Sequence, residues 1–386
     1  MHDLRLAART ARIAPFQVME LVKRAVALEH AGHPVIHLSI GEPDFTAPEP
    51  VVSALERAAR AGRTQYTAAV GLHALREAIA GDYLHRHGVV VDPGRIVVTA
   101  GASAALSLAC CALVDVGDEV LVTDPSYPCN RHFVAAFDGV PRAVPVFAET
   151  RFQMTAALLA ENWGPRTRGA LLASPANPTG TSIPFEELRR IVGQVRARGG
   201  FTIVDEIYLG LSYEGRARTA LELGEDVIVV NSFSKYFHMT GWRLGWMVVP
   251  PSAAATFEKL SQNLYICAST LAQHAALACF EPDALATFEA RREAFRQRRD
   301  YIVPAMRGLG FEVPVMPDGA FYAWLDCARF GDSGALASRL LEDASVSLVP
   351  GYDFGGNEPG RWMRLSYATA REKLEEAVER IGRCLS

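Results

Sequence analysis

Residues 227–249 read VIVVNSFSKYFHMTGWRLGWMVV, and this stretch decides the fold. It opens and closes with apolar, β-branched runs, Val227–Asn231 and Leu244–Val249, which are typical of strands buried on both faces of a sheet. A lone lysine is usually a surface charge. Lys235, however, directly follows an apolar strand, is flanked by hydroxyl side chains and is trailed by Arg243. The stretch therefore predicts chemistry at the end of a buried strand.

Similar apolar runs recur through the middle of the chain, separated by Ala-, Leu- and Arg-rich segments of helical length. Alternating strands and helices with apolar strand cores predict a mostly parallel sheet that is covered by helices on both faces. We therefore expect an α/β fold with a seven-stranded, mostly parallel sheet. The candidate strands are Ile96–Thr99, Glu119–Thr123, Arg142–Val146, Ala170–Ala173, Phe201–Asp205, Val227–Asn231 and Leu244–Val249.

The C-terminal part of the chain has a different pattern, which predicts a smaller α+β domain. It opens with a long charged helix, Pro282–Met306, whose arginines alternate with glutamates as on a solvated helix face. The elements expected after it are a strand region at Phe311–Asp326, a helix at Ser333–Asp343, a strand region at Val346–Pro350 and a helix at Arg371–Cys384. The N-terminal segment is too short to fold alone, so we expect it to join this domain. The predicted division is 1–46, 47–283 and 284–386.

The composition excludes several classes of protein. The 386 residues include 39 Lys and Arg against 43 Asp and Glu, and this net charge of -4 argues against a broadly basic nucleic-acid binder. An apolar fraction of 49% is ordinary for a globular protein, and the length suits about two domains. The seven cysteines are scattered without a C-x-x-C pair, and no apolar run resembles a signal core or a membrane span. We expect reduced thiols, a cytoplasmic location, no metal site and no membrane contact.

Four further motifs lie at or near the ends of predicted strands, where ligands collect in such sheets. Thr99–Ser103 turns from a strand into a helix through small residues, which suits an anion site but alone is more often a tight turn. Ser174–Gly180 by itself indicates a Pro/Gly turn. Asp205 ends a strand and could serve a ligand or cap a helix. Arg364 lies in an apolar stretch, where it could bind a carboxylate or pair with a structural acid.

Together these residues supply the groups that hold pyridoxal phosphate: a phosphate site, a carboxylate for the pyridine nitrogen and a lysine for the aldehyde. Their order and spacing resemble the class I/II aminotransferases, a family of pyridoxal-phosphate enzymes with the fold of aspartate aminotransferase. The resemblance covers nearly the whole chain, from about Ala11 to the last helix. The motifs that carry it are Asn177-Pro178-Thr179-Gly180, Asp205-Glu206-Ile207-Tyr208 and Ser232-Phe233-Ser234-Lys235 with Gly241-Trp242-Arg243.

The resemblance implies a catalytic role for several matching positions. Lys235 would form a Schiff base with the cofactor aldehyde and then move the substrate proton. Asp205 would keep the pyridine nitrogen protonated, so that the ring accepts electrons. Tyr208 and Asn177 would bond the phenolic oxygen of the cofactor, and Tyr127 would stack on its ring.

The resemblance also implies how phosphate, substrate and a second subunit are bound. Arg364, helped by Gly41, would bind the α-carboxylate of the substrate. Tyr66 would reach the phosphate of the neighbouring subunit, which makes a homodimer with shared active sites the functional unit. The cofactor phosphate would be held by Gly101, Ala102, Ser103, Ser232, Ser234 and Arg243.

We therefore expect an aminotransferase that moves an amino group between an L-amino acid and a 2-oxo acid, with 2-oxoglutarate or pyruvate as acceptor. Ser103 stands where some aspartate-using relatives have a lysine, and Ser261–Thr270, which matches a loop that carries an arginine in others, has no positive charge. Both absences favour a donor with a neutral or apolar side chain. The cations that could still hold a distal carboxylate are Arg12, Arg131 and His132. By family analogy the mouth of the site would be lined by Ile13, Pro15 and Phe16.

Three alternatives remain open from the sequence. A carbon–sulfur β-lyase shares this fold and most of these residues, but expels a group from Cβ. An aspartate aminotransferase would need a cation that the motifs do not reveal. A non-catalytic regulator built on the same fold would carry an N-terminal DNA-binding domain, which the short first segment and the acidic charge disfavour.

Overall fold

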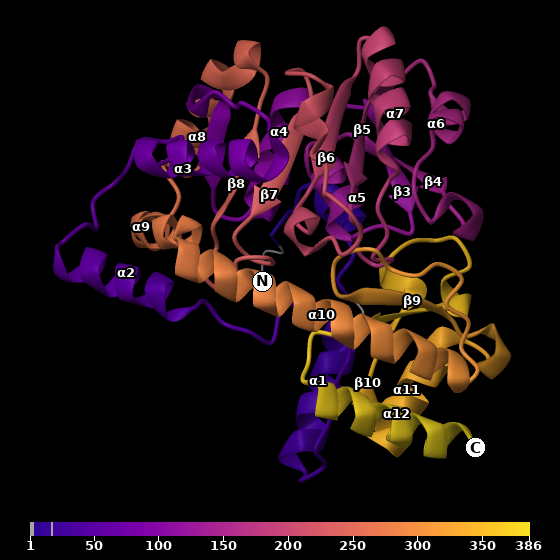
Figure 1. Cartoon of the computed structure of the whole chain (residues 1–386). Coiled ribbons are helices and arrows are strands. Elements are labelled where there is room, and N and C mark those ends of the chain that lie inside the picture. Colours follow the sequence, from indigo (N-terminus) through magenta and orange to yellow (C-terminus); the bar gives the residue numbers. More distant parts are fainter. Residues whose placement is uncertain (1–3, 17) are drawn as a thin grey trace.

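The computed structural model describes residues 4–16 and 18–386, and an open seven-stranded sheet lies at the centre of the fold (Figure 1). The strand order is β2-β8-β7-β6-β5-β3-β4. Strand β8 runs antiparallel to both of its neighbours, whereas every other neighbouring pair is parallel. The strands are β2 (Ile96–Thr99), β3 (Glu119–Asp124), β4 (Val140–Pro145), β5 (Thr167–Ala173), β6 (Phe201–Asp205), β7 (Ile228–Ser232) and β8 (Gly245–Val248). The predicted mostly parallel sheet is confirmed.

Each predicted strand overlaps an observed one, and the largest difference is at the start of β5. That strand begins at Thr167 rather than Ala170. Thr167 pairs with Glu119, and these two polar residues are the first residues of β5 and β3. The apolar pattern therefore misses residues 167–169, because pairing with β3, and not hydrophobicity, makes them part of β5.

Helices cover both faces of the sheet, because its side chains alternate between two apolar clusters. Val97 packs into the cluster that contains α4 and α8, whereas Ile96 and Val98 pack into the cluster that contains α3 and α7. The helices of this part are α2 (Glu49–Arg60), α3 (His73–Asp82), α4 (Ala102–Leu113), α5 (Cys129–Ala136), α6 (Ala156–Asn162), α7 (Phe185–Ala197), α8 (Ala254–Leu264) and α9 (Thr270–Ala276).

The long helix α10 (Pro282–Gly308) runs from the sheet domain to a smaller C-terminal unit (Figure 1). That unit contains an antiparallel three-stranded sheet in the order β11-β12-β9 and a two-stranded parallel pair of β1 with β10. Its elements are β9 (Tyr322–Asp326), α11 (Ser333–Ala344), β10 (Val346–Ser347), β11 (Val349–Pro350), β12 (Trp362–Ser366) and α12 (Arg371–Leu385), with β1 (Ile36–His37) and α1 (Val18–His30) from the N-terminal segment.

The contacts of the N-terminal segment support the domain division that we propose, 1–46, 47–283 and 284–386. Ile36 of β1 pairs with Val346 of β10, and α1 contacts both β10 and β11. Residues 1–3 and 17 of the first segment lie outside the described residues. Within the described part of the chain, no helix combines the length and the apolar character that a membrane crossing requires.

Gly169 tests how tightly the central strands pack. A Cβ atom at Gly169 would lie 2.5 Å from the carbonyl oxygen of its register partner Phe201 in β6. Since this backbone is fixed by the sheet, we expect Gly169→Ala to lower the free energy of unfolding by about 1–3 kcal/mol.

The matched control is Gly193→Ala in α7, where an added Cβ would meet no atom within 4 Å. This change should raise the free energy of unfolding by about 0.5–1 kcal/mol, because alanine loses less backbone entropy than glycine in a helix. Urea unfolding of both variants measures the difference, and equal stabilities would contradict the argument.

Candidate active site

A cavity of about 480 Å³ lies where the carboxyl ends of the parallel strands face β9 and β12 of the smaller unit. Its walls come from segments far apart in the sequence, because the loops after parallel strands meet at one edge of the sheet. Its volume is within the range of small-molecule and cofactor sites. The predicted site residues that line it are Gly41, Ala102, Ser103, Tyr127, Asn177, Asp205, Tyr208, Ser234, Lys235, Arg243 and Arg364.

Three predicted site residues lie outside this lining. Gly101 and Ser232 lie directly behind it, in contact with Arg243 and Ser234 respectively. Tyr66 is 80% exposed on the surface. The structure thus brings every residue predicted to bind cofactor or substrate, except Tyr66, into or against one cavity.

The first turn of α4 and Arg243 form a cradle for an anion. Gly101 precedes this helix with φ +86°, and a Cβ atom there would lie 2.8 Å from Nη2 of Arg243. Glycine therefore lets the guanidinium lie against the helix start, where unpaired N–H groups and the helix dipole already favour negative charge. Ser234 adds a hydroxyl, and its backbone N–H donates to Oγ of Ser232 at 3.0 Å. This arrangement suits a phosphate group.

Asp205 is a buried carboxylate at the end of β6. One of its oxygens accepts a hydrogen bond from the N–H of Ile207 at 3.0 Å. Burial raises the pKa of Asp205 to about 6, although this hydrogen bond and the charge of Lys235 oppose the shift. A protonated ring nitrogen in the cavity would offset the cost of burying this charge.

Lys235 is half-buried and extends its amine into the same cavity. Its Nζ donates a hydrogen bond to the carbonyl oxygen of Gly41 at 2.6 Å. Burial lowers the pKa of Lys235 to about 8, and the nearby charge of Glu42 is the largest opposing effect. The amine is therefore much closer to neutrality than a surface lysine, as addition to an aldehyde requires.

Arg364 presents a guanidinium to the cavity from β12. Nη1 donates to Oδ1 of Asn177 at 3.1 Å, and Nη2 donates to the carbonyl oxygen of Ser39 at 2.6 Å. Its buried Nε has no hydrogen-bond partner among the described residues. Because buried donors in proteins are normally paired, this one indicates a place for an acceptor such as a carboxylate.

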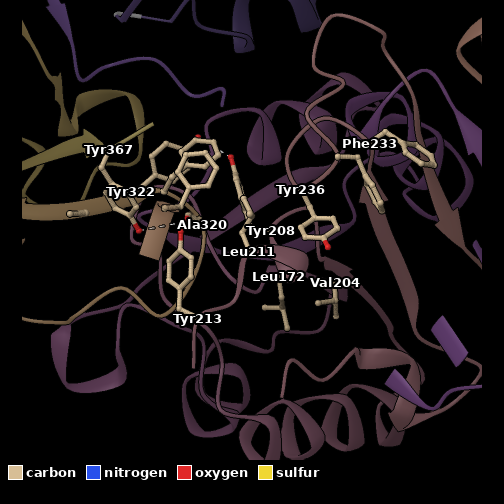
Figure 2. Packing of buried hydrophobic residues seen from close by; sticks show 14 of the residues in the cluster. Leu172, Val204, Tyr208, Leu211, Tyr213, Phe233, Tyr236, Ala320, Tyr322 and Tyr367 are labelled. Carbon is tan, nitrogen blue, oxygen red and sulfur yellow. Dashed lines mark hydrogen bonds between the residues drawn. The ribbon is translucent and has the colours of Figure 1, made fainter. Parts of the chain in front are cut away.

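Tyr208 lies beside a residue that the sequence analysis missed. Its hydroxyl oxygen is 2.8 Å from that of Tyr322 on β9 (Figure 2). Burial raises the pKa of Tyr208 well above its usual value, so the phenol keeps its proton and can donate it. Tyr322 follows Phe321 in an apolar run that is read as strand core, and no signal in the sequence shows that its hydroxyl is used.

The mouth of the cavity also differs in part from the expectation. Phe16 lines it as expected, whereas Ile13 and Pro15 are not among the described residues that do. Other lining residues could not be predicted from the sequence, because an apolar residue in a cavity wall has the same sequence pattern as one in the hydrophobic core. They include Val18, Met19, Ile40, Leu106, Val349 and Phe354.

These groups fit pyridoxal phosphate. The anion cradle matches the phosphate, buried Asp205 matches the pyridine nitrogen, and the near-neutral amine of Lys235 matches the aldehyde. The unpartnered Nε of Arg364 leaves a place for the carboxylate of an amino acid beside the cofactor.

Comparison with known proteins agrees with this geometry. The family model for aminotransferase class I and II matches residues 33–381. The valine–pyruvate aminotransferase of Mycobacterium tuberculosis is 40% identical over 97% of each chain. An aminotransferase crystal structure from Mycobacterium tuberculosis has a TM-score of 0.95 at 39% identity and covers 99% of each chain. Aspartate aminotransferase from Thermus thermophilus with maleate has a TM-score of 0.93 at 34% identity, covering 99% of this chain and 100% of that one. The chain thus belongs to the class I and II aminotransferases and is a pyridoxal-phosphate-dependent transaminase.

Proposed function

We propose that this transaminase moves the amino group of a neutral, mainly apolar L-amino acid to a 2-oxo acid, with 2-oxoglutarate or pyruvate as acceptor. The charge of the cavity wall carries this proposal. Among the described lining residues the cations are Lys235, Arg243 and Arg364, and each has a task at the cofactor or the α-carboxylate. The remaining charged lining residues, Glu42, Asp205 and Asp353, are acidic. A second carboxylate on the donor would therefore be costly to bury.

The three cations that could have held such a carboxylate do not line the cavity. Arg12 pairs with Asp138 on the surface. Arg131 donates from Nη2 to the backbone carbonyl oxygen of Asp353 at 2.7 Å. His132 is half-buried on α5 and is not among the described residues that line the cavity. These contacts support a neutral donor.

The apolar wall supports the same conclusion. Val18 and Met19 of α1, Leu106 of α4 and Val349 and Phe354 of the smaller unit face the cavity and would accept an apolar side chain. The similarity to a valine–pyruvate aminotransferase agrees with this substrate class. The likeness to an aspartate aminotransferase structure makes aspartate the second candidate.

The roles that we propose for the residues around the cofactor are those that the family resemblance implies, and the positions of these residues in the cavity support them. When bound, pyridoxal phosphate supplies an aldehyde that holds the amino group and a ring that accepts electrons from Cα. Lys235 binds that aldehyde and then moves the proton at Cα, since it is the only amine among the described lining residues. Asp205 holds the proton on the ring nitrogen. Tyr208 and Asn177 bond the phenolic oxygen, and Tyr127 stacks on the ring.

The remaining roles concern binding. Arg364 binds the α-carboxylate, and the absence of a side chain at Gly41 leaves space beside its guanidinium, whose Nη1 would lie 3.8 Å from an added Cβ. The phosphate is bound by Gly101, Ala102, Ser103, Ser232, Ser234 and Arg243.

We further propose a homodimer that acts in the cytoplasm. The exposed position of Tyr66, outside its own cavity, is compatible with a contact to the phosphate of a neighbouring subunit. All seven cysteines are free, which suits a reducing compartment.

The covalent role of Lys235 can be tested directly. Borohydride reduction of the holoenzyme fixes the cofactor to the amine that holds it. Peptide mapping should then find the pyridoxyl group on Lys235, because burial has brought that amine near neutrality. The matched control is the exposed Lys259 of α8, which should remain unmodified. A label on another lysine would contradict the assignment.

Donor preference tests the proposed substrate class. The value of kcat/KM should be higher for valine, leucine, methionine and alanine than for aspartate, each measured with the same 2-oxo acid. Following the absorbance of the cofactor in each half-reaction separates donor from acceptor. If aspartate has the highest value, the argument from the charge of the cavity wall is wrong.

Arg364→Lys tests the binding of the substrate α-carboxylate independently of the substrate's side chain. Lysine keeps the charge but loses the planar, two-pronged geometry. Since a hydrogen bond to a charged group contributes about 1.5–3 kcal/mol, we expect kcat/KM to fall roughly 10- to 150-fold for every amino acid alike. A loss confined to one class of donor would mean that Arg364 contacts the side chain instead.

Mixed dimers test the shared sites. Inactive Tyr66→Phe subunits are combined with inactive Lys235→Ala subunits. If Tyr66 serves the neighbouring site, one site of the mixed dimer carries both changes and the other carries neither, so activity should return to about one site in each mixed dimer. Light scattering provides the control, and a fully active monomer would refute the shared site.

A further inference from the structure

Tyr322 connects two groups that the proposed mechanism treats separately. It pairs with Ser366 across β9 and β12, and Arg364 pairs with Trp324. Tyr322 and Arg364 are therefore diagonal neighbours on one face of this sheet, where a long and an aromatic side chain can touch. The Cζ atom of Arg364 lies 4.6 Å from the centroid of the Tyr322 ring and 5.0 Å from that of Phe354. Because Tyr322 is fully buried, this cation–π contact is shielded from water.

The other end of Tyr322 reaches Tyr208. The two hydroxyl oxygens are 2.8 Å apart, and the rings meet edge to face with centroids 5.6 Å apart (Figure 2). The structure shows no second partner for the Tyr322 hydroxyl among the described residues. Tyr322 itself also lines the cavity, and the hydrogen bond to Tyr208 is the route by which we expect its hydroxyl to act on the site.

The direction of this hydrogen bond decides what Tyr208 can do. If Tyr208 donates to Tyr322, its proton is unavailable to any acceptor in the cavity. If Tyr322 donates instead, Tyr208 keeps a proton to donate, and its own donor strength increases because hydrogen bonds in a chain polarise one another. A negatively charged acceptor in the cavity, such as the phenolic oxygen of the cofactor, selects the second arrangement.

Gly41 shows that the site leaves room for this arrangement. A Cβ atom at Gly41 would lie 3.0 Å from the hydroxyl oxygen of Tyr322 and 3.8 Å from Nη1 of Arg364. The carbonyl oxygen of the same glycine accepts the hydrogen bond of Lys235 at 2.6 Å. Tyr322 thus lies close to Gly41, whose carbonyl oxygen holds the amine of Lys235. It also contacts Tyr208, proposed for the phenolic oxygen, and Arg364, proposed for the substrate carboxylate.

We infer that Tyr322 is a positioning residue: its hydroxyl makes Tyr208 a stronger donor to the cofactor's phenolic oxygen, and its ring supports Arg364 for the substrate carboxylate. This inference rests on the proposed roles of Tyr208 and Arg364. The experiment therefore includes variants of Tyr208 itself, so that the two proposals can fail separately.

The hydroxyl is tested by a pH titration of the visible absorbance of the holoenzyme, which needs no turnover. The phenolic oxygen helps to hold a proton on the nitrogen that joins Lys235 to the cofactor. A hydrogen bond from Tyr208 draws negative charge away from that oxygen and so lowers the pKa of the nitrogen. Tyr322→Phe weakens this hydrogen bond and should raise the midpoint by about 0.2–0.6 unit.

Tyr208→Phe removes the hydrogen bond altogether and should raise the midpoint further. In the double variant, Tyr322→Phe should add nothing to the shift of Tyr208→Phe, because the effect of Tyr322 passes through Tyr208. The matched control is Tyr213→Phe, which removes another buried hydroxyl; it bonds the backbone carbonyl of Ala320 and does not line the cavity (Figure 2). Its midpoint should equal that of the unmodified enzyme.

The ring is tested by inhibition with 4-methylpentanoate, a carboxylate without an amino group, so that binding is measured apart from chemistry. Tyr322→Phe keeps the ring and should change the inhibition constant less than twofold. Tyr322→Leu loses the cation–π contact and should weaken inhibition roughly 5- to 30-fold. If Tyr322→Leu does not fold, the titration of Tyr322→Phe still decides the first half of the inference.

Three results would overturn the inference: an unchanged midpoint in Tyr322→Phe, an equal shift in Tyr213→Phe, or additive shifts in the double variant. Equal weakening of inhibition by Tyr322→Phe and Tyr322→Leu would remove the role of the ring. If Tyr208→Phe itself leaves the midpoint unchanged, the proposed role of Tyr208 fails as well. A shift in Tyr208→Phe without one in Tyr322→Phe refutes the inference about Tyr322 alone.

Discussion

The burial of opposite charges at one edge of the sheet is the constraint on which the site depends. Asp205 ends β6 and Lys235 follows β7, its parallel neighbour, so the sheet places both at the same edge, where Asp205 is buried and Lys235 is half-buried. Burial raises the pKa of the first and lowers the pKa of the second. Burial thereby brings Lys235 nearer the neutral form that adds to an aldehyde, and it makes a protonated ring nitrogen a favourable partner for the carboxylate of Asp205.

That burial requires the smaller unit. β9 and β12 bring Tyr322 and Arg364 over the strand ends, and the pairing of β1 with β10 joins the N-terminal segment to the same unit. Two parts of the chain that are far apart in sequence therefore close one cavity. Its charged residues are divided between the two parts: the sheet domain provides the groups that we propose to bind the cofactor, and the smaller unit provides Arg364, which we propose to bind the carboxylate.

Much of this could be predicted from particular residues. Apolar runs such as Phe201–Asp205 mark the strands, because a strand buried on both faces must be apolar along its length. The order of Asn177, Asp205, Lys235 and Arg243 indicates the site, because strand ends and helix starts are visible in the sequence. The start of β5 and the role of the Tyr322 hydroxyl could not be predicted, since both depend on what lies opposite in space.

The sequence by itself determined the class of fold and, through its resemblance to a known family, the cofactor and the residues proposed to contact it, because the motifs that carry the resemblance are local patterns in a fixed order along the chain. Only the tertiary structure decided which charges share a wall. It placed Arg12 in an ion pair with Asp138, and Arg131 in a hydrogen bond with the backbone of Asp353, which itself lines the cavity. Neither arginine is among the described residues that line the cavity, whereas Glu42 is. It also brought Tyr322 against Tyr208 and Arg364. The physical reason is that electrostatic and hydrogen-bond energies depend on distances of a few ångströms, and the fold, not the order of residues, sets those distances.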